Sequence, residues 1–95
     1  MITIDNNKIT IETTRATLDD KVAFEDAVNT VVEAGHAVVL VDLSQTIYLP
    51  SELLGYLMGK KKSLMNEGKD IKITAISESL KRIFDEARIS EFLGV

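Results

Sequence analysis

The side chains of this chain offer few combinations that could carry out catalysis or hold a metal. His36 is the only histidine and cysteine is absent, so a transition-metal site would lack its usual ligands. The sequence identifies no serine or aspartate as a partner for His36, and we interpret this histidine as a turn residue and not as a general base. The acidic residues are dispersed, which argues against a paired-carboxylate site.

The glycines and the overall charge argue against two further classes of protein. The five glycines are isolated, so neither a phosphate-cradling loop nor a dinucleotide-binding fingerprint is present. With 11 basic and 15 acidic residues, the net charge of −4 does not suit a nucleic acid partner. We therefore predict a protein that is not an enzyme, binds no metal and needs no cofactor.

Hydropathy places the chain outside the membrane. No apolar run approaches the roughly 20 residues that a membrane-spanning helix needs. The first residues lack the basic and apolar regions of a signal peptide. We expect a cytoplasmic protein with no direct membrane insertion.

One strand–loop–helix unit is expected to position the functional residues of the chain. The apolar run Ala37–Leu43 shows no alternation and predicts the central strand of an α/β domain, covered on both faces. Pro50 suits the first turn of a helix, because the N–H that it lacks would have no partner there. This helix is predicted from Ser51 to Asn66, ending at Gly68. The C-terminal ends of the strands form the functional edge of open α/β sheets, so we expect function where this strand gives way to this helix.

The N-terminal third predicts a hairpin and then a helix. Apolar and polar residues alternate over Met1–Asp5 and Lys8–Thr13, which indicates strands near the sheet edge with one covered face, joined by an Asn6-Asn7 turn. Asp19 or Asp20 is predicted to cap a helix that runs to about Ala34 and stops at Gly35. Its expected core stripe consists of Phe24, Ala27, Val28, Val31 and Val32.

The remaining residues predict a strand over Ile71–Ile76 and a helix capped by Ser77. We interpret Lys60-Lys61-Lys62 as a solvated face, with a small anionic contact surface as the alternative. The apolar faces are expected to consist of Leu54, Leu57, Met58, Leu64 and Met65, then Leu80, Ile83, Phe84 and Ala87, then Ile89, Phe92 and Leu93 in a closing segment. The chain is thus predicted to be a single α/β domain, 1–95, with parallel strands joined through helices.

Two separated motifs carry a resemblance to a known family. The matching residues are Asp42-Leu43, Tyr48-Leu49 and Leu54-Gly55 in the first motif, and Ala75-Ile76-Ser77 with Leu80-Lys81-Arg82-Ile83-Phe84 in the second. With them, residues 37–95 resemble the STAS domain of bacterial anti-sigma factor antagonists, whereas the first 36 residues match in element order only. The resemblance implies the STAS fold, an open mixed β-sheet of about four strands with three to four helices.

The resemblance also implies a partner-switching role in transcription regulation. Members of this family bind a serine-kinase anti-sigma factor, a histidine-kinase-like ATPase, and phosphorylation of a serine at a helix start ends the binding. A phosphate adds about −1.5 to −2 charges and bulk to the surface that docks. The alternative is an accessory STAS subunit of a membrane transporter complex that docks without phosphorylation. A nucleotide-binding module is a third hypothesis, which the absence of a phosphate-cradling loop disfavours.

The chain departs from the family at the phosphorylation loop. Asp-Ser-Ser-Gly is here Pro50-Ser51-Glu52-Leu53, so Glu52 occupies the usual acceptor column and Ser51 the preceding one. Ser51 is the candidate acceptor; Glu52 could instead act as an imperfect phosphate mimic, or docking could need no phosphate. A helix N-cap at Ser51 and a first-turn acid at Glu52 would also explain both residues. The candidate partner-binding residues are Tyr48, Leu49, Pro50, Ser51, Glu52, Leu53 and Tyr56, whose apolar members could belong to the core instead.

Overall fold

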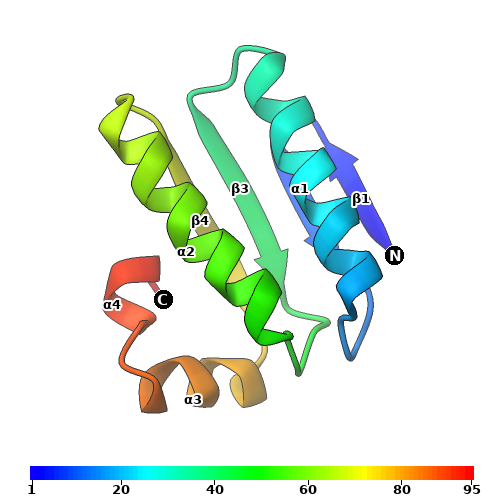
Figure 1. Cartoon of the computed structure of the whole chain (residues 1–95). Coiled ribbons are helices and arrows are strands. Elements are labelled where there is room, and N and C mark those ends of the chain that lie inside the picture. The colour runs from blue at the N-terminus through cyan, green and yellow to red at the C-terminus, as the bar shows by residue number, and fades with distance from the viewer.

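The chain begins with the predicted hairpin, and its two strands belong to one mixed sheet (Figure 1). The computed structural model describes residues 1–95. β1 (Ile2–Asp5) pairs antiparallel with β2 (Lys8–Ile11), and Asn6 in the turn between them has a φ of 57°, which asparagine tolerates. β2 lies parallel to β3 (Val38–Leu43), and β3 lies parallel to β4 (Asp70–Ile76), in the strand order β1-β2-β3-β4. The predicted α/β class with a four-stranded mixed sheet is confirmed.

Four helices complete the domain. α1 (Leu18–Glu33) and α2 (Ser51–Asn66) lie side by side in front of the sheet (Figure 1). α3 (Glu78–Glu86) crosses the end of the sheet where β3 and β4 finish, and the short α4 (Ser90–Leu93) packs against β4 and α3 (Figure 1). None of the helices combines the length and the hydrophobicity that crossing a membrane requires.

The central strand is covered on one face, and the prediction of two covered faces is wrong. Along β3, Val39, Val41 and Leu43 are buried, whereas the intervening residues remain half-exposed. Both long helices pack on the same face, so β3 alternates in burial although its sequence does not alternate in polarity (Figure 1). The other face of the sheet stays open.

Most residues predicted for the helical faces do enter the core, with four exceptions. Phe24, Val28 and Val31 of α1 are fully buried. Met65 of α2 is half-exposed, and Ile83 and Ala87 at α3 together with Phe92 of α4 also face solvent. These four predictions are wrong, because the helices pack on the sheet and on each other over narrower stripes than apolar spacing alone suggests.

The helix ends differ slightly from the prediction. Thr17, and not Asp19 or Asp20, is the N-cap of α1, and Asp20 closes a reciprocal capping box with it. Gly35 and Gly68 follow the ends of α1 and α2 with φ of 96° and 75°, as predicted for residues in this position.

Lys61 contradicts the interpretation of the lysine triplet as a solvated face. Its side chain is buried, and Nζ donates to Asp70 Oδ1 at 2.7 Å and to the Ile71 carbonyl at 2.8 Å. Lys62 is exposed, because successive helical residues point in different directions. One cation of the triplet therefore joins α2 to the start of β4.

Candidate functional site

The edge where β3 and β4 finish is also the edge where α1, α2 and α3 begin (Figure 1). The loop 44–50 connects β3 to α2 in the middle of this edge. We call this loop together with the first turn of α2 the docking edge, residues 44–54. It is the position that the sequence analysis expected to carry function.

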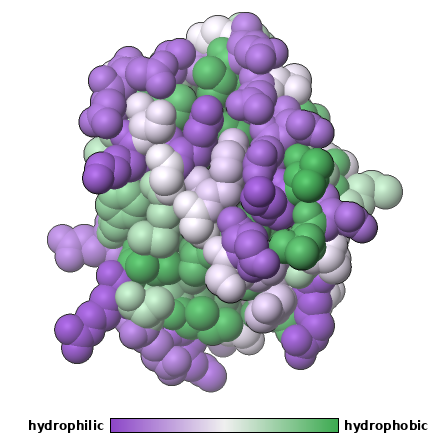
Figure 2. Space-filling model, in the orientation of Figure 1, coloured by the Kyte–Doolittle hydropathy of each residue, from purple (hydrophilic) through white to green (hydrophobic).

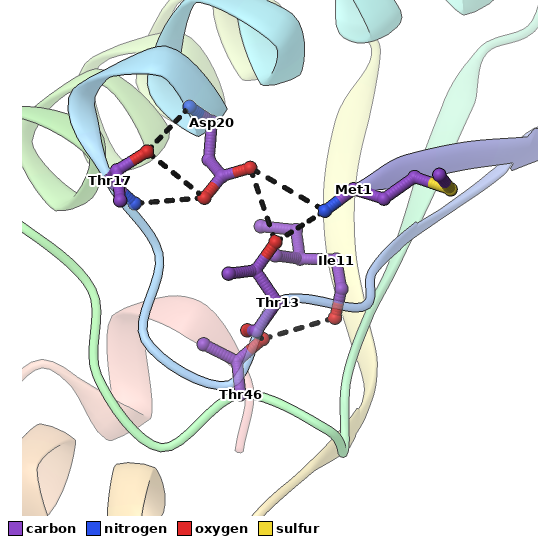
Figure 3. A network of polar contacts seen from close by, with 6 residues as sticks. All are labelled: Met1, Ile11, Thr13, Thr17, Asp20 and Thr46. Carbon is purple, nitrogen blue, oxygen red and sulfur yellow. Dashed lines mark hydrogen bonds and ion pairs between the residues drawn. The ribbon is translucent and has the colours of Figure 1, made fainter.

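Thr46 holds the loop to the end of β2. Its side chain is fully buried, and Oγ1 lies 3.1 Å from both the Ile11 and the Thr13 carbonyl oxygens (Figure 3). The next backbone group continues the attachment, because the Ile47 N–H donates to the Thr14 carbonyl at 2.8 Å. On this side the loop is therefore fixed through a buried hydroxyl and the backbone.

Ser77 holds the loop from the other side. Its Oγ donates to the Thr46 carbonyl at 2.5 Å and accepts from the Leu80 N–H at 3.2 Å as the cap of α3, which confirms the predicted cap. One hydroxyl thus joins the loop after β3 to the start of α3. Because the loop is tied on both sides, the docking edge is preorganised.

A second polar network fixes the start of α1 against the end of β2. Thr13 Oγ1 donates to Asp20 Oδ1 at 3.3 Å, and Asp20 Oδ2 accepts from the Thr17 N–H at 2.9 Å (Figure 3). The amino group of Met1 contacts both Thr13 and Asp20. The Ala16 N–H then donates to the Tyr48 carbonyl at 3.1 Å, so the starts of α1 and of α2 lie next to each other.

α2 begins with an exposed serine and an exposed glutamate. Pro50 is the N-cap, a position that offers no side-chain oxygen to the first turn, and Ser51 is the first helical residue. The predicted helix from Ser51 to Asn66 is confirmed, whereas Pro50 stands one position before the first turn and the alternative interpretation of Ser51 as an N-cap is wrong. Ser51 and Glu52 both face solvent, and the Ser51 hydroxyl makes no hydrogen bond.

The apolar candidates divide between core and surface. Leu53 is fully buried, Leu49 is 8% exposed and Pro50 is buried, so these three cannot form the contact surface expected of them. Tyr48 is 45% exposed and remains a surface residue. In the first turn of α2, Ser51 and Glu52 point away from the sheet, and Leu53 is the first residue of the helix that points towards it.

Tyr56 lies between the two helices. Its ring meets Phe24 of α1 edge to face at 5.9 Å, and its buried hydroxyl has no hydrogen-bond partner. Burial, together with the negative charges of Glu25 and Asp26, raises the pKa of Tyr56 to about 12. The side chain therefore stays neutral and belongs largely to the α1–α2 contact.

Replacing Tyr56 by phenylalanine is expected to leave the domain equally stable or more stable by about 1 kcal/mol. The change removes a hydroxyl that gains no hydrogen bond on folding and keeps the ring contact with Phe24. Urea denaturation followed by circular dichroism measures the effect. A loss of stability would mean that the hydroxyl has a partner in solution.

The other serine and threonine hydroxyls in the docking edge or beside it are already engaged. Ser44 Oγ donates to Asp42 Oδ1 at 2.7 Å, and this bond, together with the Ser44 N–H bond, holds the pKa of Asp42 below its ordinary value. Thr46 is buried, and Ser77 is committed to a cap and to the loop. Among the serine and threonine hydroxyls of this edge, Ser51 is thus the one that a serine kinase could reach without breaking a contact.

The two cavities of the domain lie away from the docking edge. No group of three or more His, Cys, Asp or Glu side chains could hold a metal ion. The larger of two cavities, about 410 Å³, lies away from the docking edge, between α2, β4 and α4. The second is lined by polar residues of α3 alone. The docking edge offers a rigid, solvent-facing surface, and a surface of this kind is suited to a protein partner.

Sequence reasoning missed the residues that make the edge rigid. The sequence analysis gives no structural role to Thr46, and it places in solvent Lys61, which joins α2 to the start of β4. A threonine in a short polar stretch directly after a buried strand was the available signal, because a loop that crosses a sheet edge needs partners for its backbone groups. No comparable local signal marks Lys61.

No protein-family model matches the chain, and no curated protein matches it. The fold defines the chain as a small α/β domain with a four-stranded mixed sheet and four helices.

Proposed function

We propose that this chain is a STAS-type, non-catalytic regulator that binds a histidine-kinase-like ATPase with serine kinase activity through its docking edge. The observation that carries the proposal is the position of Ser51 and Glu52, exposed at the start of a helix and supported by a loop that is tied on both sides. A rigid surface loses little conformational entropy on binding, which favours docking of a partner.

The two motifs of the resemblance support the proposal because they meet in space. Ser77 belongs to the second motif, and its hydroxyl donates to the carbonyl of Thr46, which lies between the Asp42-Leu43 and Tyr48-Leu49 pairs of the first motif. Residues far apart in the sequence thus build one edge. In a partner-switching protein this edge is the surface that the kinase recognises.

Phosphorylation of Ser51 is chemically compatible with the fold. The hydroxyl is exposed and free of hydrogen bonds, and the first turn of α2 has no side-chain cap. A helix N-terminus stabilises a negative charge through its dipole and its free N–H groups. A phosphate would therefore change the docking surface and leave the domain folded.

Intact-mass spectrometry tests this step. The purified chain, incubated with ATP and the serine-kinase ATPase of the same organism, is expected to gain the mass of one phosphate, and Ser51→Ala is expected to abolish the gain. Ser63→Ala is the control, because Ser63 is an exposed serine further along the same helix. An unchanged gain in the Ser51 variant would place the acceptor elsewhere.

Glu52 favours a second candidate function, a STAS-type accessory subunit of a transporter complex that docks without phosphorylation. Its carboxylate stands in the column where the family carries its acceptor, and it is exposed in the first turn of α2. A stable complex with the ATPase and no added phosphate would support constitutive docking. Absence of any complex with the kinase, together with binding to a transporter ATPase, would support the subunit.

A further inference from the structure

The outer face of α1 carries exposed apolar residues that the fold does not use. Leu18 is 54% exposed and Val22 is 58% exposed, and the two lie one turn apart on the same side of α1. Figure 2 shows hydrophobic surface over α1 at the right of the view, surrounded by hydrophilic residues. A β-branched residue exposed in mid-helix, such as Val22, costs helix propensity and gains no packing in return.

This apolar pair is continuous with the docking edge. The bond from the Ala16 N–H to the Tyr48 carbonyl places the exposed Tyr48 beside the residues that lead into Leu18. On α2, Glu52 lies one turn before Tyr56, on the side that faces α1. We call this set, Leu18, Val22, Tyr48 and Glu52, the paired-helix surface.

Unpaired acidic residues surround the apolar pair. Asp19, Asp26 and Glu52 are exposed and take part in no ion pair, whereas Lys21 is already paired with Glu25. Arg15 is the one exposed basic residue near the start of α1 without an ion pair. The raised pKa of Tyr56, to which Glu25 and Asp26 contribute, agrees with a negative potential between the helices.

We propose that the paired-helix surface is the second half of the docking site and receives an apolar patch rimmed by lysine and arginine on the kinase-type ATPase. This inference rests on the proposed function and adds to it the contribution of α1 and the chemistry of the partner. An apolar centre with a charged rim is the usual composition of a specific interface, and the acidic rim selects a basic counterpart.

Titration calorimetry with the purified serine-kinase ATPase tests the proposal. Val22→Arg is expected to weaken binding about tenfold or more, because it places a cation against a basic rim and removes apolar contact. Arginine has a higher helix propensity than valine, so the variant should fold, and its thermal unfolding checks this. Ile83→Arg is the matched control, because Ile83 is an exposed β-branched residue of α3 outside the paired-helix surface. This variant should bind the ATPase as the wild-type chain does.

Salt and charge give the second readout. Binding by the wild-type chain is expected to weaken from low to high salt, and Asp19→Asn combined with Asp26→Asn is expected to reduce this dependence. Equal affinity of the Val22→Arg and wild-type chains, with Glu52→Arg still impaired, would overturn the α1 contribution and leave the proposed function standing. No binding by the wild-type chain would overturn both.

Discussion

Leu53→Arg is expected to abolish folding of the domain. Leu53 is fully buried on the side of α2 that faces the sheet, and it belongs to a core of 18 buried apolar residues. A guanidinium at this position would lose its hydration without gaining a partner, and that cost exceeds the roughly 5–15 kcal/mol that stabilises a typical domain. The variant should show no cooperative unfolding transition in urea and no native circular dichroism.

Two variants make this result interpretable. Leu53→Ala removes volume without adding charge, and it is expected to fold with stability reduced by about 2–5 kcal/mol. Met65→Arg introduces the same charge at a half-exposed position of the same helix and should fold normally. A folded Leu53→Arg chain that has lost only its partner would instead place Leu53 on the surface.

Lys61→Met is expected to destabilise the domain by about 3 kcal/mol. The change keeps most of the apolar stem of the side chain, but it removes the ammonium that bonds Asp70 Oδ1 and the Ile71 carbonyl. Losing one partner of a buried pair costs about 3–5 kcal/mol, and the lower end applies because the Asp70 side chain is 27% exposed and keeps some water.

The neighbouring lysine provides the control for this prediction. Lys62 is the next residue along the helix, and its side chain is exposed and makes no ion pair. Lys62→Met therefore removes the same charge without breaking a contact. Its effect on the free energy of unfolding, measured by urea denaturation, should stay within about 0.5 kcal/mol, as for most surface substitutions. Equal effects of the two variants would show that the buried pair contributes nothing to the fold.

The same pair predicts how stability depends on pH. Burial alone would raise the pKa of Asp70, but the hydrogen bonds from Lys61 and from the Ile71 N–H, with the charges of Lys61 and Lys72, bring it below its ordinary value of 3.8. A carboxyl whose pKa is lower in the folded chain stabilises the fold fully above the ordinary pKa and loses this effect as the pH falls through the folded pKa. Acid should therefore destabilise wild type more steeply below about pH 4 than it destabilises Asp70→Asn.

The elements were predictable because their signals are local. The alternation in β2 and the spacing of Phe24, Val28 and Val31 reflect which side of a single element is covered, and a sequence window contains that pattern. The helix stops at Gly35 and Gly68 follow from the conformation of one residue each. Prediction of these features therefore needed no knowledge of the neighbouring elements.

The parts that could not be predicted depend on how elements meet. An apolar run such as Val38–Leu43 suits a strand covered on one face or on two, and only the placement of α1 and α2 on the same side decides between them. Lys61 is buried because Asp70 stands opposite it on another element. The predicted bounds of α2 are correct, but only the packing of this helix on the sheet decides that Leu53 belongs to the core and not to the surface.

The measurement that most directly tests the account is a map of the bound surface by nuclear magnetic resonance. Isotope-labelled chain is titrated with the unlabelled serine-kinase ATPase, and changes in the amide signals are followed residue by residue. The account predicts that the perturbed amides gather at the docking edge, 44–54, and along α1 from Leu18 to Asp26. Perturbations centred on the open face of the sheet, or no perturbation at a saturating concentration of the ATPase, would contradict it.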